Sequence, residues 1–160
     1  LTARDVAGNP RERQPLRIVV DSSARLPAEA QLFQEPGPLL VATAHASKGR
    51  TEALCAAGAQ VMRLATENGS VDLNALLKVL GERGITSLLV EGGGTLLGSF
   101  FDLGLVDKVV AFISPVILGG RDSPSPVAGT GVATIADSMR LKRTRVDIIG
   151  QDVMMTGYVR

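Results

Sequence analysis

The sequence predicts an α/β fold with a mostly parallel sheet, helices on both faces of that sheet, and an antiparallel hairpin at the C-terminus. Three observations support this prediction. Short apolar runs alternate with segments of helical spacing, which is typical of parallel strands covered on both faces. Residues 141–160 contain two strand-like runs joined at 150–151, where a glycine favours a tight turn. The chain has 160 residues, enough for one domain with its own core.

The first strands are expected where β-branched and other apolar residues follow a proline or glycine. These runs are "PLRIVVD" at 15–21, "GPLLVATA" at 37–44 and "AQVMRLA" at 59–65. An alanine-rich helical segment, 47–59, connects the second run to the third. The clearest helix covers 70–84, because its leucines recur at i, i+3, i+4 and i+7. Ser70 or Asp72 can cap this helix, and Gly84 ends it.

The second half of the chain predicts a fourth strand at 85–91, a helix to about Leu103 and a fifth strand at 107–118. Residues 119–138 are rich in glycine, serine and proline and are expected to form a long loop. Loops of this length usually have a use. This loop could be a ligand lid, an oligomer contact or a mobile segment, and the sequence does not choose among the three.

Composition excludes several classes of protein. The formal net charge of +1 gives no reason to expect a nucleic acid or a membrane surface as partner, and no apolar run approaches the roughly 20 residues of a membrane span. The single cysteine and single histidine exclude an internal disulfide framework and disfavour a zinc site. Cys55 is expected to be a small core residue. A cytoplasmic location is the expectation, because nothing requires an oxidising compartment.

The stretch "LLVEGGGTLLGSFF" at 88–101 places an acid and three glycines between a predicted strand and a predicted helix. A helix start offers free backbone N–H groups, and glycine lets a phosphate approach them. The alternative is a tight turn, for which one glycine would suffice. The Walker and Rossmann patterns are both absent, and so is the acid that usually binds the ribose hydroxyls, which leaves room for a 2′-phosphate. Lys48 and Arg50, or Ser22 and Ser23, are candidates to meet such a phosphate.

Glu91 ends the apolar run just before the glycines. A carboxylate at the mouth of a strand can orient a substrate or move a proton. The alternative is an exposed acid without a role.

Four segments together resemble the reductase domain of bacterial riboflavin biosynthesis, which has the dihydrofolate reductase fold. They are "LTAR" at 1–4, "RIVVDS" at 17–22, "LLVEGGGTLLGSF" at 88–100 and "GLVDKVVAFISPVILGG" at 104–120. The resemblance implies NADPH-dependent reduction of 5-amino-6-(5-phosphoribosylamino)uracil, whose ribosyl group becomes a ribityl chain. It also implies a homodimer, and a deaminase domain that is often fused upstream.

The resemblance assigns roles to named residues. It implies that Ser22 and the segment 93–99 contact the cofactor, the latter comprising Gly93, Gly94, Thr95, Leu96, Leu97, Gly98 and Ser99. It implies that Leu1, Arg4 and Glu91 contact the substrate, with Arg4 at its phosphate. Glu91 is also the candidate for proton transfer during ring opening.

One departure from the family pattern affects the domain assignment. Residues 1–160 are expected to form a single reductase domain that lacks the family's N-terminal strand and helix segment. Two alternatives therefore stay open beside the uracil reductase. One is another NADPH reductase of the same fold, including one acting on the undeaminated pyrimidine. The other is a non-catalytic fragment that binds NADPH or a partner chain.

Overall fold

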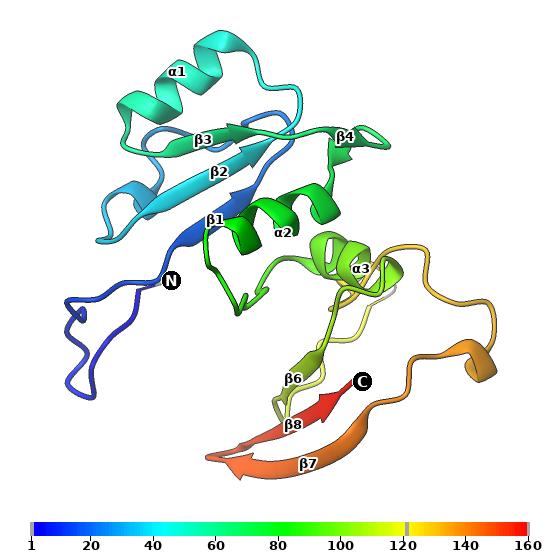
Figure 1. Ribbon diagram of the computed structural model, residues 1–160. Coiled ribbons are helices and arrows are strands. Elements are labelled where there is room, and N and C mark those ends of the chain that lie inside the picture. The colour runs from blue at the N-terminus through cyan, green and yellow to red at the C-terminus, as the bar shows by residue number, and fades with distance from the viewer. Residues whose placement is uncertain (1, 121, 160) are drawn as a thin grey trace. The chain divides into compact units, whose positions relative to one another are not determined.

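The computed structural model describes residues 2–120 and 122–159 (Figure 1). The chain divides into two compact units, Leu1–Ser87 and Leu88–Arg160, and each is a structure in its own right. None of the helices in the described residues is long and apolar enough to cross a membrane. Leu1, which the family resemblance places at the substrate, lies outside the described residues.

The first unit is built on a parallel sheet of three strands in the order β1-β2-β3. They are β1 (Arg17–Val20), β2 (Leu39–Thr43) and β3 (Gln60–Arg63). All five residues of β2 are buried, as expected for the central strand of a covered sheet. The three strands therefore form where the β-branched and apolar runs predict them.

Two helices of the first unit bury different apolar groups. Leu54 of α1 (Lys48–Ala56) is buried in a cluster with Leu39 and Val41, so α1 covers the sheet face to which odd-numbered β2 residues point. The helix α2 (Leu73–Glu82) buries three leucines outside that cluster, Leu73, Leu76 and Leu80. Leu40 is equally buried and points to the opposite sheet face. The parallel α/β core is thus confirmed.

The ends of α2 confirm the capping prediction and select between its alternatives. The side chain of Asp72 accepts a hydrogen bond from the Ala75 N–H at 3.0 Å, so Asp72 rather than Ser70 caps the helix. Gly84 has a φ of +77°, which glycine adopts at low cost, and stops it.

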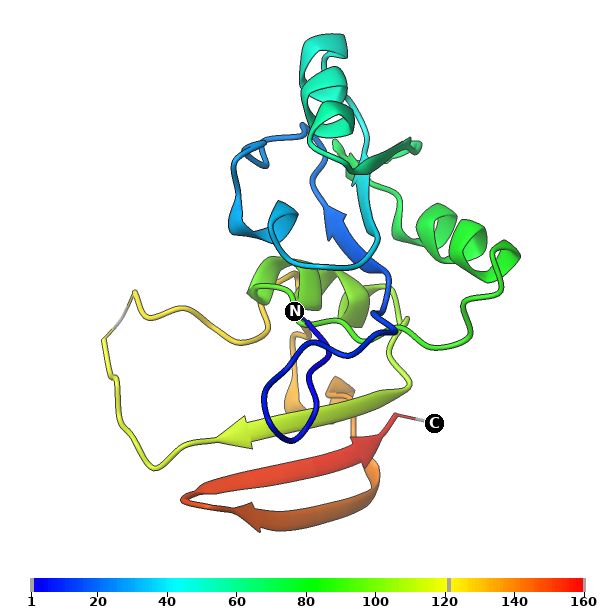
Figure 2. The same cartoon turned by 90° about the vertical axis from the view of Figure 1, so that its left-hand side faces the viewer.

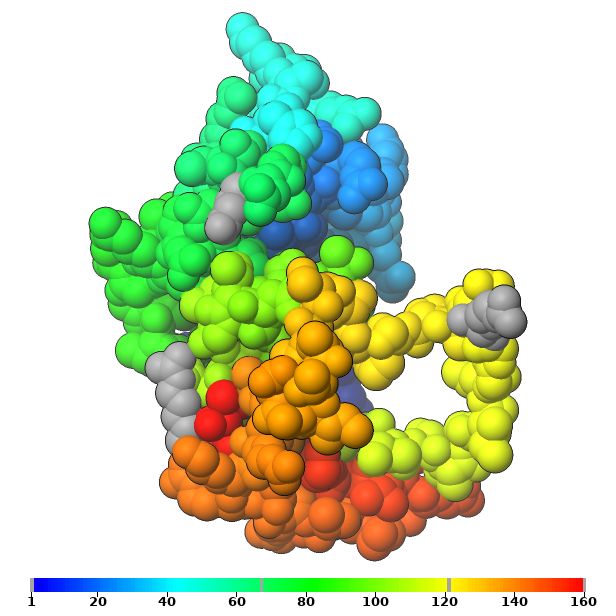
Figure 3. Space-filling model, turned by 90° about the vertical axis from the view of Figure 1, so that its right-hand side faces the viewer, coloured from blue at the N-terminus to red at the C-terminus, as the bar shows by residue number. Residues whose placement is uncertain are grey.

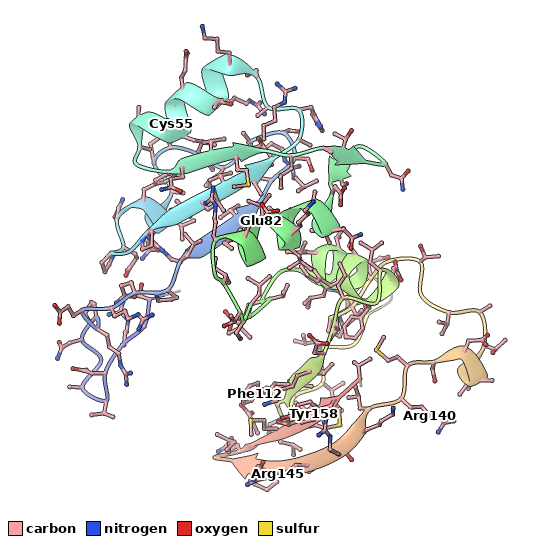
Figure 4. The ribbon with its side chains drawn as sticks, viewed as in Figure 1. Cys55, Glu82, Phe112, Arg140, Arg145 and Tyr158 are labelled. Atoms are coloured by element: carbon pink, nitrogen blue, oxygen red, sulfur yellow. The ribbon has the colours of Figure 1, made fainter. Side chains whose placement is uncertain are left out.

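Cys55 corrects one sequence expectation, because its side chain is exposed rather than part of the core (Figure 4). Leu54 is the residue of α1 that turns inward. Successive residues on a helix point about 100° apart, since 3.6 residues make one turn. The neighbour of an inward leucine therefore faces solvent.

A short hairpin, β4 (Thr66–Glu67) and β5 (Ser70–Val71), was not predicted. Asn68 and Gly69 join its strands with φ values of +50° and +77°. Asn-Gly is a strong signal for such a two-residue turn, so "TENGSV" contained the information. The flanking strands were too short to show the usual alternation.

The second unit contains α3 (Gly94–Asp102) and an antiparallel sheet in the order β6-β8-β7 (Figure 2). The strands are β6 (Lys108–Ile113), β7 (Lys142–Ile149) and β8 (Asp152–Tyr158). The C-terminal hairpin β7-β8 turns at Gly150, as predicted, with a φ of +64°. A register shift near Arg143 interrupts β7.

The predicted strand at 85–91 does not form. A strand needs a neighbour that accepts and donates its backbone hydrogen bonds, and among the described residues no strand pairs with this segment. Leu89 is 75% exposed, so the apolar run is not buried either. The fifth strand likewise ends at Ile113 instead of continuing to residue 118. Residues 119–120 and 122–138 form the expected long loop, with one short 3-10 turn at Ile135–Asp137.

Candidate cofactor and substrate site

The glycine segment forms the start of helix α3. Gly93 is the N-cap, with a φ of −69° and a ψ of 168°, and within the described residues no side chain caps this end of the helix. The first N–H groups of a helix lack partners within the helix, and the helix dipole makes this end positive. The turn therefore has the donors and the charge that bind a phosphate.

Gly93 is a favoured type of N-cap residue, but neither backbone strain nor crowding requires glycine there. Its φ is one that any residue adopts, and a Cβ built on it would meet nothing within 4 Å. Gly92 differs, because its Cβ would lie 2.7 Å from the side chain of Leu96. Gly93 is therefore the position at which a side chain would project into the open space beside the first turn.

Gly94 and Gly98 have a packing role, because a loop crosses them at backbone distance. A Cβ at Gly94 would overlap the carbonyl oxygen of Ser125, and a Cβ at Gly98 would overlap that of Ala128. The Ala128 N–H also donates to the Gly94 carbonyl at 3.0 Å. These two glycines thus let the long loop lie on α3.

Asp102, the last residue of α3, accepts two backbone hydrogen bonds from the same loop. Its Oδ2 accepts from the Thr130 N–H at 2.7 Å, and its Oδ1 accepts from the Gly131 N–H at 3.2 Å. These bonds, with the Thr130 bond first, lower the pKa of the Asp102 carboxyl from its ordinary value. The hydrogen bonds from the loop therefore stabilise the ionised form of Asp102.

Glu91 lies three residues before α3 and is exposed. Within the described chain its carboxylate has no recorded hydrogen bond or ion pair. Within the described residues Glu91 thus makes no contact that would explain it as a structural residue.

Ser22 lies just beyond the carboxyl end of β1, in the first unit. Its Oγ accepts from the Val71 N–H at 3.1 Å, and its carbonyl accepts from the N–H groups of Ala44 and His45. Among the described residues no acceptor is found for the Ser22 hydroxyl hydrogen, so it can donate to a ligand.

A polar cluster beside Ser22 joins the ends of β1 and β2. The Ser23 hydroxyl and His45 Nε2 are 2.8 Å apart, and Arg50 Nη1 donates to the Ser23 carbonyl at 3.1 Å. Ligands of open parallel sheets bind at the carboxyl ends of the strands. Sequence reasoning named Ser23 and Arg50 as candidates but did not assign His45, which is 22 residues from Ser23 along the chain.

The first unit also has an open hollow of about 290 Å³. It lies between the start of α1 and the ends of β2 and β3, and its lining includes Lys48, Arg63 and Thr51. Lys48 Nζ is 3.8 Å from a carboxylate oxygen of Glu52. The described residues contain no group of three or more His, Cys, Asp or Glu side chains suited to a metal ion.

Arg4 is held by its own unit. Its Nη1 donates to the Gly8 carbonyl at 3.0 Å, and its Nη2 lies 3.4 Å from a carboxylate oxygen of Glu35. The Thr2 hydroxyl donates to the same oxygen at 2.6 Å, and this bond, together with the charge of Arg4, lowers the pKa of Glu35. The side chain of Arg4 is still 47% exposed and retains donors for a ligand.

Comparison with known proteins identifies the family. Residues 1–155 match the model of the RibD C-terminal domain family. The chain belongs to this family. The resemblance drawn from the sequence motifs is thereby confirmed.

Two curated relatives of this RibD C-terminal domain cover most of the chain. Riboflavin biosynthesis protein RibD of Actinobacillus pleuropneumoniae is 35% identical over 148 residues, which are 91% of this chain and 39% of that protein. The 2,5-diamino-6-ribosylamino-4(3H)-pyrimidinone 5′-phosphate reductase of Methanothermobacter thermautotrophicus is 36% identical over 146 residues, or 91% of this chain and 67% of that protein. The chain thus spans about two fifths of the length of the bacterial RibD relative.

A solved structure shows the same fold as this RibD C-terminal domain. It is a diaminohydroxyphosphoribosylaminopyrimidine deaminase/5-amino-6-(5-phosphoribosylamino)uracil reductase from Thermotoga maritima, with a TM-score of 0.68 and 21% identity. The alignment covers 91% of this chain and 38% of that one. The fold class predicted from the sequence is confirmed by this likeness together with the observed elements.

Proposed function

We propose that this chain is an NADPH-dependent oxidoreductase that reduces 5-amino-6-(5-phosphoribosylamino)uracil to its ribitylamino form. The names of the two proteins described as reductases support a reductase acting on a phosphoribosylaminopyrimidine. The observation that carries the proposal is Gly93, because neither its φ nor its packing requires glycine at a helix start that has no side-chain cap. A ligand phosphate at this turn accounts for it.

In this proposal the residues 93–99 hold the phosphates of the nicotinamide cofactor, and Ser22 makes a second contact. The first turn of α3 supplies backbone N–H donors and the positive end of the helix dipole. Ser22 supplies a hydroxyl at the end of β1. When bound, the cofactor supplies the hydride.

The substrate roles follow from charge and exposure. Arg4 binds the substrate phosphate, since a guanidinium fork can pair two of its oxygens. Glu91 faces the ribosylamine and moves a proton from the amine nitrogen to the ring oxygen as the bond between C1′ and that oxygen breaks, so that C1′ and the nitrogen form an imine able to accept a hydride. Leu1 belongs to the substrate contacts in the same proposal.

Turnover with purified protein tests the function directly. We expect NADPH oxidation to depend on 5-amino-6-(5-phosphoribosylamino)uracil and to yield the ribitylamino product. The undeaminated 2,5-diamino pyrimidinone is the second candidate substrate, favoured by the name of the Methanothermobacter relative. A higher kcat/KM on that compound would select the second candidate. NADPH binding without turnover of either compound would leave only a binding module.

The choice of cofactor gives a first prediction. The cluster of Ser23, His45 and Arg50 is expected to meet the 2′-phosphate, with Lys48 as a further cation. Arg50→Ala should raise the Kd for NADPH about tenfold, or ~1.4 kcal/mol, and leave the Kd for NADH unchanged. Arg83→Ala, an exposed arginine at the end of α2, is the matched control. Equal turnover with NADH and NADPH by the unaltered protein would contradict the assignment.

Assembly gives a second prediction, a homodimer. Val110 and Phe112 are 47% and 62% exposed and share one face of the edge strand β6, on which Figure 4 labels Phe112. Exposed apolar side chains on an edge strand favour pairing with another copy. Light scattering at micromolar concentration should give the mass of two chains, and Phe112→Ser should lower it. Val132→Ser, which changes an exposed loop valine, should leave the mass unchanged. A monomeric unaltered protein would reject the dimer.

The uracil substrate must itself be produced by another reaction. The Thermotoga protein is named for a deaminase and a reductase together, and the chain covers 38% of it. We propose that a deaminase, fused or separate, supplies the uracil substrate of this chain. A cytoplasmic location remains part of the same proposal.

A further inference from the structure

A strap, defined here as residues 125–131 of the long loop, lies along helix α3 from its start to its end. Ser125 meets Gly94 at the start, Ala128 and Gly129 meet Gly98 one turn later, and Gly131 meets Asp102 at the end. Figure 3 shows this region of the loop, in yellow and orange, against the yellow-green residues of α3. The strap and the helix belong to the same unit.

The strap contacts the first turn of α3 through backbone atoms. The Ala128 N–H donates to the Gly94 carbonyl at 3.0 Å, and the glycines at 94 and 98 allow the approach. Backbone contacts cannot be relaxed by a change of rotamer. A displacement of the strap therefore acts directly on the peptide units of the helix start.

The far end of the strap is held by a charge. Asp102 accepts from the N–H groups of Thr130 and Gly131, and hydrogen bonds to a carboxylate are stronger than those between neutral groups. A carboxylate at the C-terminus of a helix is disfavoured by the helix dipole. The two donated bonds compensate for this repulsion, so Asp102 has a specific partner in the strap.

We propose that Asp102 is a positioning residue for the cofactor: it anchors the strap, and the strap fixes the first turn of α3 that binds the phosphates. This inference rests on the function proposed above. Asp102 lies eight residues beyond Gly94, which corresponds to about 12 Å along a helix. It does not touch the phosphates and acts through the strap.

Asp102→Asn and Asp102→Ala test the inference, with Asp107→Asn as the matched control. Asp107 is also an exposed aspartate of the second unit, and its side chain has no recorded bond among the described residues. In both Asp102 variants, amide hydrogen exchange should become faster at Thr130 and Gly131. The Kd for NADPH should rise about tenfold in Asp102→Ala and less in Asp102→Asn, which keeps one acceptor. At saturating NADPH, kcat and the KM for the pyrimidine should stay within about twofold of the unaltered values.

The pattern of effects separates positioning from general damage. Faster exchange with an unchanged NADPH Kd would overturn the inference, and so would unchanged exchange at Thr130 and Gly131. An equal loss of pyrimidine and NADPH affinity would also overturn it, because a purely structural role predicts that result. An unaltered protein that binds no NADPH would overturn the proposed function and this inference with it. If the unaltered protein binds NADPH and both Asp102 variants bind it with the same Kd, the inference is overturned and the proposed function is not.

Discussion

Gly93→Val is expected to weaken NADPH binding at least tenfold, or ~1.4 kcal/mol, while the protein keeps its far-UV spectrum. The valine side chain would project into the open space beside the first turn of α3, where the proposal places the pyrophosphate. The φ of −69° at this position accepts any residue. The cost to folding is limited to the difference between glycine and valine as N-cap residues. Isothermal titration with NADPH and a thermal melt measure the two effects separately.

Gly98→Ala supplies the contrasting variant. Its Cβ would overlap the backbone of Ala128 and Gly129, neither of which can turn aside. Overpacking of this kind typically costs about 1–3 kcal/mol of stability. We therefore expect a lower melting temperature in Gly98→Ala and a nearly normal one in Gly93→Val. If Gly93→Val binds NADPH with unchanged affinity, the turn has only a structural role.

Local signals in the sequence predicted the first unit well. The β-branched run "RIVV" and the apolar run "LLVAT" became β1 and β2 at the expected places, because a buried parallel strand needs no more than continuous apolar residues. The helix α2 followed from its leucine spacing and its two end residues, Asp72 and Gly84. The segment 85–91 has the same kind of local pattern, but among the described residues no strand pairs with it. A local pattern does not show whether a pairing strand exists, so the prediction failed here.

The roles of the individual glycines could not be predicted, because their neighbours come from a distant part of the chain. The sequence indicated that "EGGGTLLG" starts a helix and offers a phosphate site. It contained no sign that Gly94 and Gly98 face the backbone of residues 125–129, or that Asp102 bonds Thr130 across 28 residues. The pairing of Ser23 with His45 is of the same kind. Such contacts depend on how loops fold back on the regular elements.

The proton-transfer role proposed for Glu91 predicts the largest kinetic effect. Glu91→Gln keeps the size of the side chain and removes its charge and its proton. If the carboxylate moves a proton in the slow step, kcat should fall by ~10²-fold or more, with an unchanged Kd for NADPH. Stopped-flow measurement of NADPH oxidation with the uracil substrate reports this step. Glu82→Gln, an exposed glutamate at the end of α2, is the control. A variant Glu91→Gln with full kcat would leave Glu91 only the role of orienting the substrate.

Arg4→Ala should give the opposite kinetic pattern, a raised KM for the pyrimidine at nearly constant kcat. The phosphate is bound alike in the ground state and the transition state, so loss of its partner affects binding uniformly. The expected cost is about 1.5–3 kcal/mol, the value of a hydrogen bond to a charged group. The existing bonds of Arg4 to Gly8 and Glu35 hold the guanidinium in place before substrate arrives. Arg13→Ala removes an equal charge from an exposed site of the same segment and should leave KM unchanged. If Arg4→Ala leaves KM unchanged too, Arg4 does not bind the phosphate, and the match of "LTAR" to a substrate-binding segment is wrong.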